Sequence, residues 1–149
     1  MSSIFNKADN VAILNRINSL TSESKAQWGK MTADQMCKHC SLAIAVAFGE
    51  QDLRINFLMR LLGKMLKKKV IHGNHLKKES PTAKEFIVTK HYDLEKVKSE
   101  LIAHFSRFAT EGESAIQVKK HPFWGTMTNE EWDLLMWKHL DHHLKQFGV

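Results

Sequence analysis

Residues 128–148, TNEEWDLLMWKHLDHHLKQFG, carry the signals of a long helix from its first turn to its last. Thr128 followed three residues later by Glu131 is the pattern of a capping box, in which the two side chains bond the free backbone amides at a helix start. We therefore expect a helix that begins near Thr128 and runs nearly to Phe147. Its second half contains three histidines, so the direction of each imidazole decides what the helix can do.

The three histidines do not point the same way. Each residue of an ideal helix advances by about 100°, which places His143 about 40° from His139 and His142 about 60° away on the other side. His139 and His143 fall inside the arc of apolar residues, whereas His142 lies at its edge. Two imidazoles four residues apart on one face can bind the same metal ion. The spacing alone leaves two interpretations open, a pair of metal ligands or two ordinary core histidines with other partners for their ring nitrogens.

A second helix is predicted by residues 32–49, TADQMCKHCSLAIAVAFG. Thr32 and Gln35 form another capping box, and Gly49 is placed to end the helix. Because this stretch is apolar almost all round, the helix should be central in the fold. His39 shares its face with two alanines, which would let another helix approach closely. His39 is therefore a candidate third ligand, and the alternative is a single core histidine bonded to a neighbouring group.

The two cysteines flank His39 but do not suit a metal site or a redox centre. On a helix Cys37 and His39 point about 200° apart, so the CKHC sequence cannot chelate one ion. A redox C-x-x-C motif begins a helix that follows a strand, and no strand is expected here. We therefore expect Cys37 and Cys40 to be buried and reduced. Two cysteines are too few for a disulfide framework, and no secretory signal is visible, so we expect a cytoplasmic protein.

Further helices complete a predicted bundle. One begins near Asp9, with apolar residues three and four positions apart, and another lies between Asp93 and Gly112. Residues 67–92 have the least regular sequence and predict a long connection with a short extended piece at EFIV. The chain is long enough to bury a core of its own, and no repeat or linker divides it. These features predict an all-α helical bundle formed by a single domain, residues 1–149.

Residues 53–66 combine apolar side chains with basic ones and allow two interpretations. We favour a helix that packs on the core with a basic outer face, and the alternative is an amphipathic helix at a membrane surface. The formal net charge of +6 originates here, because residues 60–78 contain seven basic residues and no acidic one. No nucleic-acid reading motif or aromatic platform accompanies them, so we expect a solvated surface, or one that attracts an anionic small molecule, and no dedicated nucleic-acid binding. No apolar run reaches the roughly 18–20 residues of a membrane span.

The order of the three inward-facing histidines resembles that of a known superfamily. His39 on one helix is followed about a hundred residues later by His139 and His143 on the last, as in the DinB/YfiT-like superfamily of four-helix-bundle, metal-dependent proteins. The chain more specifically resembles one branch of that superfamily, which has a C-terminal HHLxQFG-type signature. The segments that carry this resemblance are WGKMTADQMCKHC, HPFWGTMTNEEW and KHLDHHLKQFG. The resemblance covers most of the chain from Trp28 onward. It implies a DinB-like four-helix bundle with a long irregular crossover connection.

The resemblance also implies a divalent metal ion, zinc or nickel, held by His39, His139 and His143, and no other cofactor. Characterised relatives include thiol-dependent transferases and isomerases as well as hydrolases. Three protein ligands leave a position for water or substrate, and the ion could lower the pKa of a bound water or thiol.

Two functional interpretations follow. One is a metal-dependent hydrolase or thiol S-transferase whose substrate is a small molecule, either anionic or a low-molecular-weight thiol. The other is a non-catalytic metal-binding or stress-associated interaction bundle. Neither interpretation identifies catalytic residues, and a homodimer is left open.

Overall fold

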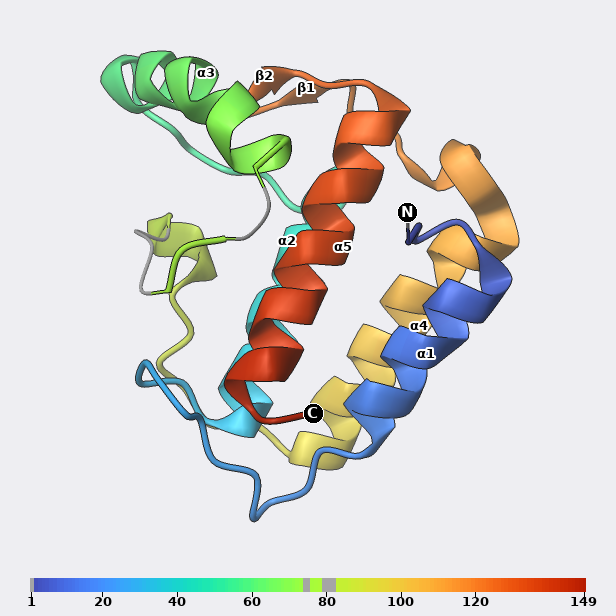
Figure 1. Ribbon diagram of the computed structural model, residues 1–149. Coiled ribbons are helices and arrows are strands. Elements are labelled where there is room, and N and C mark those ends of the chain that lie inside the picture. The colour runs from blue at the N-terminus through green and yellow to red at the C-terminus, as the bar shows by residue number, and fades with distance from the viewer. Residues whose placement is uncertain (1, 74–75, 79–82) are drawn as a thin grey trace.

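The computed structural model describes residues 2–73, 76–78 and 83–149, and its regular structure is mainly helical (Figure 1). The α-helices are α1 (Lys7–Asn18), α2 (Ala33–Ala47), α3 (Phe57–Ile71), α4 (Leu94–Glu111) and α5 (Asn129–Gln146). Short 3-10 helices span Lys84–Phe86 and Gly112–Ala115, and two short antiparallel strands are β1 (Lys120–His121) and β2 (Gly125–Thr126).

Helices α1, α2, α4 and α5 form the bundle. Helix α4 packs against both α1 and α2, and α5 packs against the same two helices. Figure 1 shows α2 beside α5 and α1 beside α4, with the long axes of each pair running roughly together. The predicted all-α bundle is confirmed.

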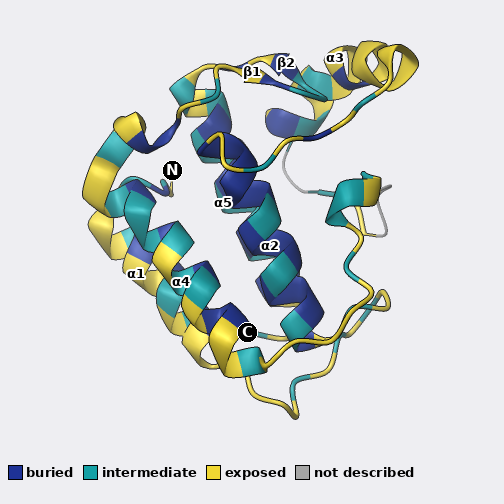
Figure 2. Cartoon of the chain, turned by 180° about the vertical axis from the view of Figure 1, so that it is seen from behind, coloured by how far each residue is buried: buried dark blue, intermediate teal, exposed yellow. Residues whose placement is uncertain are grey.

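The core lies between these four helices because each one turns an apolar stripe inward. On α4 the buried residues recur every three or four positions: Val97, Leu101, Phe105 and Phe108. Helix α2 is buried on nearly every face, as the dark colouring of Figure 2 shows, which fits its predicted central place. Burying such side chains contributes about 25 cal/mol per Å² of apolar surface, so this core is the main source of stability.

Local capping signals account for where the bundle helices begin. The Thr32 amide donates to Gln35 Oε1 at 3.1 Å, at the start of α2. At the start of α5 the Thr128 amide donates to Glu131 Oε2 at 2.9 Å, and the Glu131 amide donates to Thr128 Oγ1 at 3.1 Å. Asp93 caps α4 as predicted. Helix α1 begins two residues before Asp9 because the side chain of the preceding asparagine caps it.

The prediction for residues 53–66 is wrong in its bounds and in its packing. Helix α3 begins at Phe57 because Asn56 caps it, and it continues to Ile71, within the expected connection. Apart from the buried Ile71 at its end, which belongs to the core, its apolar side chains are mostly exposed, and Phe57 is 81% exposed. The extended piece expected at EFIV is in part a 3-10 helix, Lys84–Phe86. Residues 74–75 and 79–82 of the predicted connection lie outside the described residues.

A short hairpin, β1–β2, lies in the chain between the second 3-10 helix and α5, contacts α3, and was not predicted. His121 organises it, because its Nδ1 accepts hydrogen bonds from the amides of Phe123 and Trp124 at 3.0 and 3.2 Å. Helix α3 packs on the hairpin at the buried Gly63, where a Cβ atom would collide with the carbonyl oxygen of Phe123. Lys67 of α3 also forms an ion pair with Glu131 of α5 at 2.7 Å.

Candidate metal centre

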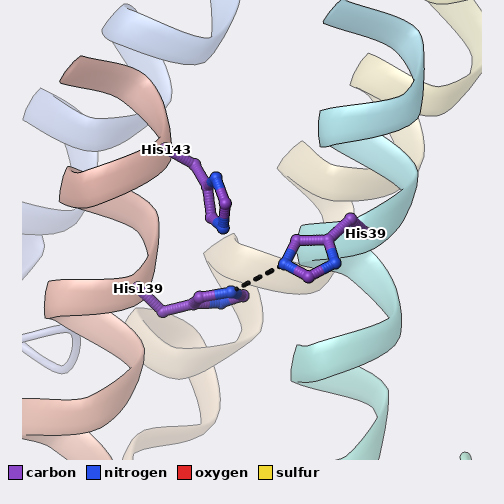
Figure 3. A group of neighbouring side chains, drawn as sticks. All are labelled: His39, His139 and His143. Atoms are coloured by element: carbon purple, nitrogen blue, oxygen red, sulfur yellow. Dashed lines mark hydrogen bonds between the residues drawn. The ribbon is translucent and has the colours of Figure 1, made fainter. Parts of the chain in front are cut away.

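Three imidazoles meet between α2 and α5 (Figure 3). His39 comes from α2, and His139 and His143 lie one turn apart on α5. The ring centroids are 5.0 Å apart for His39 and His139, and 4.7 Å apart for each of the other two pairs. One nitrogen from each ring lies within 4.8 Å of the others. The structure therefore brings together the three residues that the sequence singled out.

Hydrogen bonds fix the tautomers of two of these rings. His39 Nδ1 lies 2.9 Å from the carbonyl oxygen of Phe86, which can only accept, so Nδ1 carries the hydrogen. His143 Nδ1 lies 2.9 Å from Gln146 Oε1, while the amide nitrogen of Gln146 donates to the carbonyl oxygen of Trp28 at 2.7 Å. In both rings Nε2 consequently keeps its lone pair. Histidines that bind metals are held in the same way, by a hydrogen bond from the nitrogen that does not touch the ion.

The third ring leaves the cluster without a complete set of hydrogen bonds. His139 Nε2 lies 3.0 Å from His39 Nε2 and donates to it, because the His39 nitrogen has no hydrogen. Among the described residues, the buried Nδ1 of His139 has no hydrogen-bond partner. A buried polar atom without a partner costs about 1–3 kcal/mol. Three imidazoles with two lone pairs directed at one small region fit a divalent cation, whose coordination would take the place of the His39–His139 hydrogen bond.

The electrostatics of the cluster favour neutral rings. Burial lowers the pKa of His39 and lowers that of His143 to about 3. Burial also lowers the pKa of His139 well below its usual range, and the neighbouring His143 and His39 lower it further. All three imidazoles are therefore uncharged at neutral pH, which is the form that binds metal ions.

His142 lies apart from the converging nitrogens. Its ring packs edge-on against Trp28, with centroids 5.7 Å apart, and helps to line a small open cavity of about 160 Å³. The other residues that line this cavity are Trp28, Leu76, Lys78, Lys138, Asp141 and Lys145. The edge position predicted for His142 is what the structure has, and it puts a histidine of α5 at the rim of a basic cleft.

The remaining sequence candidates do not join the centre. Cys37 and Cys40 are buried free thiols, and burial raises the pKa of Cys37 to about 12 and that of Cys40 well above its usual value. Protonated thiols of this kind are structural. Outside these candidates, the exposed carboxylate of Glu50 near the end of α2 pairs with Arg107 at 2.8 Å and is not part of the histidine cluster. Sequence reasoning missed Phe86 altogether, because a backbone carbonyl has no residue signature.

Fold and cluster together define the class of this protein: an all-α bundle in which three histidines on two facing helices form a group that could hold a metal ion. The chain belongs to the family described as "Protein of unknown function (DUF1569)", whose model matches residues 4–148. The match includes both α2 and α5 and all three histidines. No curated protein and no solved structure shows significant similarity to this chain.

Proposed function

We propose that this protein is a metal-dependent enzyme of the DinB/YfiT-like superfamily, a hydrolase or a thiol-dependent transferase. His39, His139 and His143 hold a divalent ion, zinc or nickel, both of which accept imidazole nitrogen readily. The observation that carries this proposal is the pair of fixed tautomers, with the Nδ1 atoms of His39 and His143 engaged by Phe86 and Gln146. Ordinary core histidines have no need to direct their free nitrogens at one another.

The protein's own residues supply the geometry of the site. Phe86 and Gln146 hold the two rings in orientation, and the buried surroundings keep all three ligands neutral. A bound ion would act as a Lewis acid and would lower the pKa of a water or thiol in a position that the three imidazoles leave open.

The cleft beside His142 supports a small anionic substrate or a low-molecular-weight thiol that carries carboxylates. Three lysines line it: Lys78, Lys138 and Lys145. Asp141 also lines it, but Lys145 and Arg16 each pair with that carboxylate, at 2.7 and 2.9 Å. The cleft therefore presents a net positive charge to a ligand. It is close to the cluster, because His142, which lines it, directly precedes His143 on α5.

The test begins with metal content. Wild type and the single alanine variants of His39, His139, His143 and His142 are purified with the same zinc or nickel supply, and bound metal is measured by mass spectrometry. Loss of an outer hydrogen-bond partner costs about 10–100-fold in metal affinity, so loss of a ligand should cost more than about 100-fold. His142→Ala is the matched control and should retain the ion. Equal loss from all four variants, or from none, contradicts the proposed ligand set.

A second measurement separates an enzyme from a non-catalytic bundle. Cobalt-substituted protein is titrated with small thiols while its visible spectrum is recorded, and metal-loaded protein is screened against ester, amide and thiol-transfer substrates. A spectral change on thiol addition, with turnover that is lost in His139→Ala, supports the enzyme. If the protein binds one ion per chain, but its spectrum does not change on thiol addition and no substrate is turned over, the centre belongs to the non-catalytic alternative.

A further inference from the structure

We propose that α3 docks this protein on anionic membranes, lying flat on the lipid surface with its apolar side inserted among the headgroups. The helix carries an unusual set of exposed apolar side chains. Phe57, Leu58 and Met65 are 81%, 72% and 74% exposed, and Met59, Leu61, Leu62 and Leu66 are exposed as well. Exposed apolar side chains concentrated on one element mark an interaction site. This proposal is independent of the metal centre.

The apolar side of α3 faces away from the protein. At about 100° per residue, the seven exposed apolar residues occupy a continuous arc of about 200°. The buried residues of the helix, Gly63 and Ile71, lie on the opposite side, against the hairpin and the rest of the chain. Figure 2 shows α3 at the edge of the molecule with mainly exposed colouring, apart from the four helices of the bundle. The helix is thus fixed in an orientation that presents its apolar arc to the surroundings.

The charge of α3 complements an anionic surface. The helix contains no acidic residue. Among the described residues, neither Lys68 nor Lys69, which lie within the outward arc, takes part in an ion pair. Arg60 and Lys64 fall on the side toward the protein, as does Lys67, which is paired with Glu131. A basic residue near an anionic leaflet contributes about 1 kcal/mol to binding. An amphipathic helix with basic residues and Phe, Leu and Met on its outer side is the pattern of an interfacial helix.

The positions of two lysines favour a lipid surface over a second copy of the chain or an apolar protein groove. Lys68 and Lys69 fall at about 20° and 120° from Phe57, inside the apolar arc. Against a second copy these cations would face their own counterparts, and in an apolar groove they would be buried. At a lipid surface their long side chains can extend to the phosphates while the stems stay among apolar groups. With 15 residues α3 is short for a span, and no described helix is long and apolar enough to cross a membrane.

Vesicle flotation tests the proposal with the full chain. The probes are vesicles of phosphatidylcholine and vesicles in which about one third of the lipid is phosphatidylserine. Wild type should float with the anionic vesicles only, and the binding should weaken as salt is raised. The double variant Phe57→Ser with Met65→Ser should bind at least about tenfold more weakly, because two apolar insertions are lost. Val11→Ser, which removes an exposed apolar side chain from α1, is the control and should bind as wild type does.

Two results would overturn the proposal. One is the absence of α3-dependent binding to anionic vesicles, seen either as a failure of wild type to bind or as binding that the double variant leaves unchanged. The other is a concentration-dependent dimer, seen by analytical ultracentrifugation, that the double variant abolishes, which would assign the apolar side of α3 to a second copy. Both substituted side chains are largely exposed, so circular dichroism should show an intact fold and make either result interpretable.

Discussion

Replacing Gln146 by methionine should weaken both the fold and the metal centre. The Gln146 amide accepts from His143 Nδ1 and donates to the carbonyl oxygen of Trp28, at 2.9 and 2.7 Å, and the residue is buried. Methionine has similar length but neither group, so the His143 N–H and the Trp28 carbonyl both lose a partner. Each unsatisfied buried group costs about 1–3 kcal/mol, and we expect a total of about 2–4 kcal/mol because the Trp28 carbonyl is only partly buried.

The loss should appear in two assays. In chelator, where no ion contributes, the melting temperature should fall by about 5–15 °C for a chain of this size. In a competition with a chromogenic chelator, zinc affinity should fall by about 10–100-fold, because His143 is no longer held in its binding tautomer. The control is Gln117→Met, at an exposed glutamine whose side-chain amide donates to the nearby Ser114 carbonyl. Unchanged zinc affinity in Gln146→Met would refute the argument that this hydrogen bond prepares the ligand.

Three further predictions concern stability. Lys98 is buried and donates to two carbonyls at the end of α1, so Lys98→Met should lower the free energy of unfolding by about 2–4 kcal/mol in urea titrations, with the exposed Lys96→Met as control. Burial lowers the pKa of His121 to about 4, and the unfolded chain binds the extra proton at higher pH, so His121 alone should contribute a loss of about 2 kcal/mol of stability from pH 7 to pH 5. Measured in chelator, so that no bound ion contributes, this contribution should vanish in His121→Asn, whose side chain keeps a hydrogen-bond acceptor but does not titrate. Gly63→Ala should free α3 from the hairpin backbone and speed amide exchange throughout that helix, whereas the exposed Leu62→Ala should not.

The bundle and the direction of its histidines could be predicted because their signals are local. A capping residue acts within one turn, so Thr32, Asp93 and Thr128 marked three helix starts correctly. Helix phase is equally local, and it separated His142 from the two histidines that face α2. The convergence with His39 needed more than phase, because residues 100 positions apart meet only through tertiary packing. There the resemblance to a metal-binding superfamily supplied what spacing could not.

The rest could not be predicted, for two different physical reasons. The amphipathic pattern of α3 reveals an apolar side but not what that side faces, and here the side against the protein is the one with Gly63. The partner of His39 is invisible in the sequence because Phe86 acts through its main-chain carbonyl. Helix phase places Gln146 near the ligand face, but its second hydrogen bond, to the distant Trp28 carbonyl, depends on tertiary packing. The two strands of the hairpin held by His121 are too short to show an alternating pattern in the sequence.

The carbonyl that orients His39 has a consequence for how this site can change over time. Because a main-chain atom makes the hydrogen bond, the amino acid at position 86 can be exchanged without altering that bond. The side chain is constrained separately, because the Phe86 ring packs against the core and edge-on against the His39 ring, so homologous chains should vary there mainly among apolar residues. Insertions and deletions near residues 83–88 are another matter, since they would carry the carbonyl away from the ring. Selection on this segment should thus be visible as constant length, together with apolar character but not a fixed identity at position 86.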